Sequence, residues 1–203
     1  MQDAQFNAWS RQSQLPVEMR HSMRELNHRF LDLVASRPDG WRASRSGSFE
    51  VSARVAPLSA AQKAAVSNCP YALFDLRFHD DRYWQTRLEA GGHWSIAEDA
   101  ADPQTLEFVK LAMFFAWHAA STTKLAAQLL LGMHDATAAA FRGATIDCLP
   151  ALAASAAVHL SARWSDCGRY WSALTGAASG PNTAELRRIQ LYGLQLAAAA
   201  RLS

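Results

Sequence analysis

The chain has 203 residues, of which 50% are hydrophobic and 19% are charged. This composition excludes an intrinsically disordered protein, which would combine few hydrophobic residues with a high net charge. The formal net charge of +2 is too small to indicate, on its own, binding to nucleic acid or to a membrane. The length suits one well-buried core, so we expect a flexible N-terminus over residues 1–15 and a single domain over 16–203.

The first predicted helix begins at Pro16 and ends before Pro38. Its hydrophobic residues recur at alternating steps of four and three, which places them along one face. Two heptads are too few to specify a coiled coil, so this face either docks onto the protein's own core or forms a dimer interface. The residues of this face are Met19, Met23, Leu26, Phe30 and Leu33.

A small β-hairpin is predicted near residues 41–55. Hydrophobic and polar residues alternate from Phe49 to Val55, which is the period of a strand. The surrounding arginines make this the most basic part of the chain, and they are candidate contacts to nucleic-acid phosphates. The alternative is a solvated sheet edge that is guarded by charge. The candidate arginines are Arg37, Arg42, Arg45 and Arg54.

Polar capping residues mark the helices of the next segment. The capping box from Ser59 to Gln62 predicts a short helix, and Asp80 or Asp81 can begin another that runs through Arg87. Between them, Leu73–Phe78 fits either a helical turn or a buried strand.

An aromatic and polar cluster follows between positions 79 and 94. It is the candidate ligand pocket of the chain, because such pockets combine aromatic walls with a few polar groups. The alternative is an edge of the core where the indole N–H groups find local partners. The cluster consists of His79, Tyr83, Trp84, His93 and Trp94.

An apolar helical core is predicted for about residues 102–200. The Asp102-Pro103 pair starts a helix that is apolar on most sides and therefore central. A later helix should begin near Ile146 or Pro150 and run to about Trp164. A capping box from Asn182 to Glu185 opens the last helix. The expected fold is mainly α: a helical, bundle-like single domain with a small N-terminal β-hairpin.

The sequence contains no recognised catalytic or cofactor-binding motif, such as a P-loop, GxGxxG, HExxH or GxSxG. Cys148, Cys167 and His159 are not spaced as zinc ligands, which usually come in close pairs. We therefore expect no catalytic residue, no metal and no cofactor. The isolated cysteines and the lack of an apolar export signal predict reduced thiols and a cytoplasmic protein. The run Leu111–Thr123 is too short to span a membrane, which takes about 20 residues.

The turn at Leu131-Gly132-Met133 separates two helical segments, as in a helix-turn-helix. From about Phe108 to Asp166, the chain resembles the D subunit of the bacterial flagellar master transcription regulator. The resemblance lies in the apolar helix, this turn, the alanine-rich helix after it and the helix entered through Leu149-Pro150. It implies an all-helical cytoplasmic protein that dimerises and binds DNA with a partner subunit. The helix after Gly132 has few side chains that can read bases, so packing is its expected role.

These observations predict a non-enzymatic cytoplasmic regulatory or protein-interaction protein, related to a transcription regulator. We expect a homo-oligomer or a complex with a partner protein, with nucleic acid as an open alternative partner. The last helix is a candidate interface, because Leu191, Tyr192 and Leu196 exceed what one face needs. The alternative is a small-molecule-binding protein or enzyme that uses the cluster from His79 to Trp94.

Overall fold

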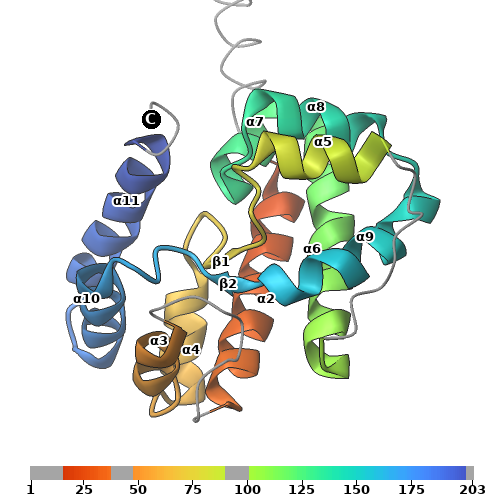
Figure 1. Ribbon diagram of the computed structural model, residues 1–203. Coiled ribbons are helices and arrows are strands. Elements are labelled where there is room, and N and C mark those ends of the chain that lie inside the picture. The colour runs from red at the N-terminus through yellow and green to blue at the C-terminus, as the bar shows by residue number, and fades with distance from the viewer. Residues whose placement is uncertain (1–15, 38–47, 90–100, 200–203) are drawn as a thin grey trace, which may run out of the picture.

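The computed structural model describes residues 16–37, 48–89 and 101–199. Helices dominate this part of the chain, so the expected mainly α fold is confirmed. In Figure 1, α2 (Val17–Ala35) and α6 (Pro103–Thr122) stand side by side at the centre. Helices α5 (Asp81–Glu89) and α8 (Asp135–Gly143) lie across the top of these two.

The C-terminal helices form one side of the molecule. Helix α11 (Thr183–Ala199) packs on α10 (Gly168–Ser179), and α10 in turn contacts α3 (Ser48–Val55) and α4 (Ala60–Ser67). The remaining helical segments connect α6 to α10. They are α7 (Lys124–Ala126), the π-helix η1 (Ala127–Leu131), the 3₁₀ turn η2 (Ile146–Cys148), α9 (Leu149–Ala156) and the 3₁₀ turn η3 (Ala157–His159).

The predicted hairpin near residues 41–55 is wrong for its described part, because residues 48–55 form helix α3. The alternating pattern also places Val51 and Val55 four residues apart, which is one face of a helix. Both valines are buried, whereas Ala53 is exposed. The Ser52 hydroxyl lies 3.1 Å from the carbonyl oxygen of Val34 and 2.7 Å from that of Arg37, so it ties α3 to the end of α2.

Two short strands join distant parts of the chain instead. β1 (Phe74–Asp75) pairs antiparallel with β2 (Ser161–Ala162), with Phe74 opposite Ala162. The prediction that a helix runs to Trp164 is therefore wrong, because α9 ends at Ala156. Alanine-rich composition favours helix locally, but the pairing with β1 over a long sequence separation overrides it.

The capping signals of the sequence are confirmed. Ser59 and Gln62 form a reciprocal capping box at the start of α4. Asp102 accepts hydrogen bonds from the backbone N–H groups of Gln104 and Thr105 at the start of α6. The Asn182 side chain accepts in the same way from the first turn of α11. These polar residues satisfy N–H groups that a helix start leaves without partners.

The hydrophobic face of α2 packs against the protein's own core. Its five residues, from Met19 to Leu33, are all buried, which confirms the docking alternative for this helix and leaves no exposed seam for a second copy. No helix within the described residues is both long enough and apolar enough to cross a membrane. The expected flexible N-terminus, residues 1–15, lies outside the described residues.

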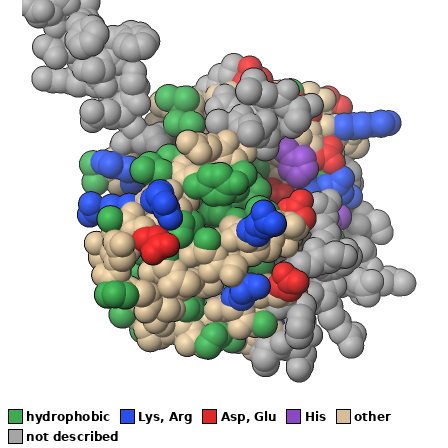
Figure 2. Space-filling model, turned by 90° about the vertical axis from the view of Figure 1, so that its left-hand side faces the viewer, with side chains coloured by type: hydrophobic (Ala, Val, Ile, Leu, Met, Phe, Trp, Pro, Cys, Tyr) green, Lys and Arg blue, Asp and Glu red, His purple; other side chains and the backbone are tan. Residues whose placement is uncertain are grey.

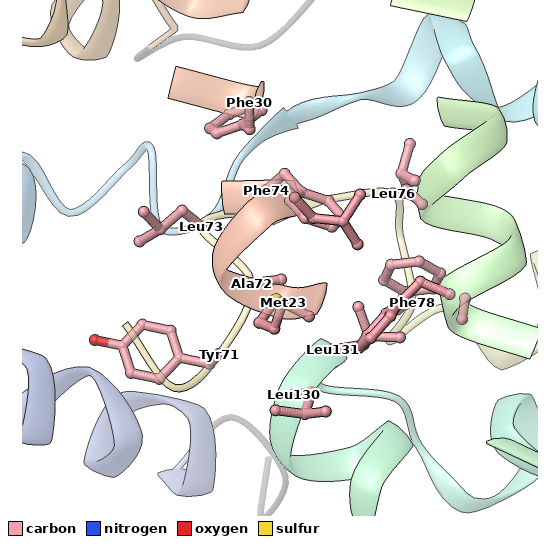
Figure 3. Packing of buried hydrophobic residues seen from close by; sticks show 14 of the residues in the cluster. Met23, Phe30, Tyr71, Ala72, Leu73, Phe74, Leu76, Phe78, Leu130 and Leu131 are labelled. Atoms are coloured by element: carbon pink, nitrogen blue, oxygen red, sulfur yellow. The ribbon is translucent and has the colours of Figure 1, made fainter. Parts of the chain in front are cut away.

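Asn27 is the polar centre of this core. Its side chain is fully buried on α2. The amide nitrogen donates to the carbonyl oxygens of Ser67, Cys69 and Tyr71, at 3.3, 3.3 and 2.9 Å. The amide oxygen accepts from the backbone N–H of Leu73 at 2.8 Å. One side chain thus satisfies the backbone of an irregular segment that no regular ladder supports. Figure 3 shows this segment, from Tyr71 to Phe78, running among the core side chains.

We expect Asn27→Ala to lower the free energy of unfolding by about 3–5 kcal/mol, because it leaves several buried backbone groups without partners. Urea denaturation at fixed pH measures this change. Asn68→Ala is the matched control, since Asn68 is exposed and only its backbone caps α4. A loss for Asn27→Ala no larger than that of the control would contradict the role given to Asn27.

Candidate functional site

The structure does not gather the four candidate arginines into one described basic patch. Arg37 pairs with Asp102, and its Nη1 donates to the Thr105 hydroxyl at 3.0 Å. Arg54 is exposed on α3 and lines a different surface beside α10. Arg42 and Arg45 lie outside the described residues. Phosphate contacts by this set stay a prediction, and Arg37 already has an internal acid as its partner.

The Arg37 contact changes the titration of Asp102. Burial opposes ionisation of this carboxyl, but hydrogen bonds from Arg37 and Thr105 outweigh it and lower its pKa to about 2. Asp102 therefore stays ionised near neutral pH, where it caps α6 and holds Arg37 against the helix start. This arrangement is a structural clamp between the end of α2 and the start of α6.

The aromatic cluster divides between the core and the surface. Trp84 is fully buried, stacks on Phe78 with ring centroids 5.9 Å apart, and donates its indole N–H to the carbonyl of Arg77 at 3.0 Å. His79 is on the surface, with its Nδ1 3.7 Å from Asp75. His93 and Trp94 lie outside the described residues. The indole partner is the local one expected for a core edge.

Tyr83 contacts two arginines, a histidine and a backbone carbonyl. The guanidinium carbons of Arg77 and Arg87 lie 4.8 and 5.3 Å from its ring centroid. The His159 ring lies edge-on to the Tyr83 ring, with the two ring centroids 5.2 Å apart. The Tyr83 hydroxyl donates to the Ser155 carbonyl at 3.4 Å. Burial is the main cause that raises the pKa of this hydroxyl. Tyr83 therefore joins α5 to α9 through cation–π and ring contacts.

The helix after Gly132 packs against α5, as expected from its small side chains. Gly132 has a left-handed φ of 74°, which confirms the predicted turn. Thr137, at the start of α8, donates from its backbone and its hydroxyl to the Asp81 carboxylate, at 3.0 and 2.6 Å. His134 faces the same carboxylate at 3.5 Å. These contacts tie the start of α8 to the start of α5.

A hollow of about 340 Å³ lies between α2 and α6. Ser36 and Asp32 line it, and the Ser36 hydroxyl donates to the Leu33 carbonyl at 2.8 Å. The lining combines apolar Phe108 and Leu111 with charged Arg29 and Glu107.

A buried polar network connects the core to α11. The hydroxyls of Tyr71 and Tyr170 lie 2.8 Å apart, and Tyr71 also donates to the Gln190 carbonyl at 2.9 Å. The Cys69 sulfur is 4.0 Å from the Tyr170 hydroxyl. Burial raises the pKa of Cys69 to about 12, so this thiol is neutral and a poor nucleophile at neutral pH. Burial likewise raises the pKa of both tyrosines.

Arg163 lies next to this network, directly after β2. Its backbone N–H donates to the Leu73 carbonyl at 2.9 Å, and its guanidinium carbon is 4.7 Å from the ring centroid of Trp164. Gly132 lies against its other side, where an added Cβ would overlap Nη2. Nη1 is buried and has no hydrogen-bond partner among the residues that the structure describes. Burial is the main cause that lowers the pKa of this guanidinium.

Arg163 could not be predicted as a notable residue while residues 150–164 were expected to form one packed helix. A signal was nevertheless present, since Arg163 is the sole lysine or arginine between Arg142 and Arg169. A lone arginine at the end of an alanine-rich run needs either solvent or an acceptor. The strand pairing that places it beside Gly132 and Trp164 could not be read from periodicity.

The outer face of α11 is the most exposed apolar feature of the C-terminal side. Leu191 is 61% exposed and Tyr192 is 48% exposed, while Ile189 on the same helix is buried. Leu196, which was expected to share this face, is half-buried and packs against the core.

Comparisons with known proteins find no family model, no curated protein and no solved structure that matches this chain. Within the described residues, no group of three or more His, Cys, Asp or Glu side chains could hold a metal ion.

We expect Asp102→Asn to make the free energy of unfolding depend less on pH in the acidic range. The folded pKa of Asp102 lies below its unfolded value of about 4, so its contribution is fully present above pH ~4 and is lost as pH falls towards about 2. The change is on the order of 1 kcal/mol, because 41% of this side chain is exposed and solvent screens the pair. Asparagine keeps the capping oxygen. Urea unfolding between pH 2 and 6 checks this, with Asp166→Asn, at an exposed turn, as the control.

We expect glycine-to-alanine substitutions at Gly193 and Gly176 to change the stability of the fold in opposite directions, because only Gly193 lies against Tyr71. A Cβ at position 193 would overlap the Tyr71 hydroxyl, whereas nothing lies within 4 Å of one at Gly176. We expect Gly193→Ala to lower the free energy of unfolding by about 1–3 kcal/mol through overpacking. Gly176→Ala, at an exposed position inside α10, should raise it by about 0.5–1 kcal/mol. Thermal and urea unfolding measure both; equal effects would argue against the tight docking of α11.

Proposed function

We propose that this protein is a non-enzymatic regulatory or protein-interaction protein that self-associates through the exposed face of α11. The observation that carries the proposal is the exposure of Leu191 and Tyr192 on a helix whose opposite face is anchored to Tyr71. Figure 2 shows hydrophobic side chains gathered near the middle of this side of the molecule, with basic side chains beside them. Contiguous apolar surface of this kind typically marks an interaction site.

A second copy of the chain fits this face by its charge pattern. The charged residues of α11, which are Glu185, Arg187 and Arg188, all precede the apolar pair, and residues 193–199 carry no charge. Two α11 helices packed antiparallel about Leu191 and Tyr192 would set each basic half against the uncharged half of the other. This pairing buries the apolar side chains without placing like charges together, in the self-complementary form of a two-fold interface.

The regulatory part of the proposal rests on the sequence resemblance of residues 108–166 to dimeric bacterial transcription regulators. The free thiols of Cys69, Cys148 and Cys167 support a reducing compartment, and we place the protein in the cytoplasm. Two contacts count against nucleic acid as the partner. Arg37 is held by Asp102, and the helix after Gly132 is packed on α5.

We expect the wild-type protein to form a reversible dimer and Leu191→Glu to weaken that dimer by about tenfold to a hundredfold. Burying one leucine is worth about 1.5–3 kcal/mol, and each 1.4 kcal/mol is a factor of ten in the dissociation constant. Sedimentation velocity over a concentration series measures the constant. Tyr192→Ala should act in the same direction.

Val17→Glu is the matched control, because Val17 is an aliphatic residue of similar exposure, 65%, on a different helix. It should leave the dissociation constant unchanged, and circular dichroism should show that all variants keep their helical content. A wild-type protein that stays monomeric throughout the series would refute self-association. A dimer that survives Leu191→Glu would place the interface elsewhere.

A further inference from the structure

The hollow of about 340 Å³ between α2 and α6 has the size of a small ligand site. Its volume lies near the lower end of the range for small-molecule pockets, about 300–1,000 Å³, so it suits a ligand of amino-acid size. The lining residues recur at steps of three and four, so they share one face of each helix. Those used below are Arg29, Asp32 and Ser36 from α2, and Glu107, Phe108 and Leu111 from α6.

The clamp between Arg37 and Asp102 holds the two walls of this hollow together at one end. It joins the end of α2 to the start of α6, so the two helices lead away from it in opposite chain directions. Ser36 is therefore the lining residue of α2 nearest the clamp, and Arg29 is the farthest from it. Groups carried by two packed helices are held more precisely than groups on loops, which favours a defined site.

Two opposite charges on the walls of the hollow have no ion-pair or hydrogen-bond partner among the described residues. They are Arg29 on α2 and Glu107 on α6, and both side chains are exposed. Asp32 differs, because its two carboxylate oxygens lie 2.9 Å from Lys63 Nζ and 3.6 Å from His28 Nε2. Within the described part of the chain, one wall thus offers an available cation and the other an available acid.

We propose that this hollow binds a free α-amino acid with an apolar side chain. The guanidinium of Arg29 presents a fork of donors to the ligand's carboxylate, and Glu107 accepts from its ammonium group. The Ser36 hydroxyl donates to the Leu33 carbonyl, so its oxygen keeps lone pairs that can accept from the ligand. Phe108 is only 4% exposed, whereas Leu111 is 39% exposed and offers apolar surface for the ligand's side chain to cover.

The combination of charges selects a zwitterion over singly charged ligands. A carboxylic acid without an amine would be attracted to Arg29 but repelled by Glu107, and a simple amine would meet the reverse arrangement. An amino acid carries both charges and satisfies both walls. The site is separate from the exposed face of α11, so its failure would leave self-association through α11 unaffected.

The test compares L-phenylalanine with analogues that each lack one of its features, in titrations of the full chain followed by two-dimensional amide NMR spectra. Phenethylamine lacks the carboxylate, hydrocinnamate lacks the ammonium group, and glycine lacks the apolar side chain. We expect L-phenylalanine to bind with a dissociation constant of about 0.1–1 mM, as suits a ligand of its size. Each analogue should bind at least about tenfold more weakly.

Two substitutions assign the charges to their walls. Arg29→Met should weaken the binding of L-phenylalanine about tenfold and leave that of phenethylamine unchanged, because phenethylamine has no carboxylate. Glu107→Gln should weaken L-phenylalanine to a similar extent and leave hydrocinnamate no more weakly bound. Arg24→Met and Glu18→Gln, at exposed positions of α2 outside the lining, are the matched controls and should bind as the wild type does.

Circular dichroism should show the same helical content for all variants, because each of the four positions is exposed. The proposal is overturned if L-phenylalanine does not bind saturably, or if the singly charged analogues bind as tightly as it does. It is equally overturned if L-phenylalanine binds both the Arg29→Met and the Glu107→Gln variants with the affinity of the wild type.

Discussion

The buried amide of Asn27 is the contact on which the rest of the structure depends. After α4 ends at Ser67, residues 68–73 run through the core in an irregular conformation, so their backbone groups and the last carbonyl of α4 need partners that no helix supplies. Asn27 provides four of these hydrogen bonds from α2. With this segment held in place, the Ala72 N–H reaches the Leu130 carbonyl of η1, and the Leu73 carbonyl receives the Arg163 N–H. Tyr71, two residues away, is aimed at α11.

The helices that begin at capping residues could be predicted from the sequence. Ser59, Asp102 and Asn182 act within one turn of their own positions, so their effect is visible in a short window. The hydrophobic face of α2 could also be predicted, because its period is regular over the whole helix. The turn at Gly132 belongs to the same class, since glycine tolerates the left-handed backbone that it requires.

The failures involve contacts between residues far apart in the chain. Residues 161–162 have helical composition but pair with Phe74 and Asp75, and periodicity carries no information on that pairing. The alternation from Phe49 to Val55 fitted both a strand and a helix, and the outcome depended on Ser52 reaching the end of α2. The surroundings of individual candidate residues also depended on contacts that are distant in the chain. For Trp84, the sequence left a pocket and a core edge open, and its burial with a local indole partner fits the core edge, while Arg163 was hidden in an alanine-rich run.

The position of α11 at one side of the fold has an energetic consequence. This helix packs on α10 and η1, its Gln190 side chain donates to the Ala65 carbonyl of α4 at 3.1 Å, and its central anchor is the Tyr71 hydroxyl beneath Gly193. Because it is the last helix and does not contribute to the packing of α2 on α6, it can open locally with a free energy below that of the whole domain. Its amide hydrogens should therefore exchange with solvent earlier than those of α2 and α6. Any partner that binds the outer face of α11 adds its binding free energy to this local opening, and so protects the buried tyrosine pair as well.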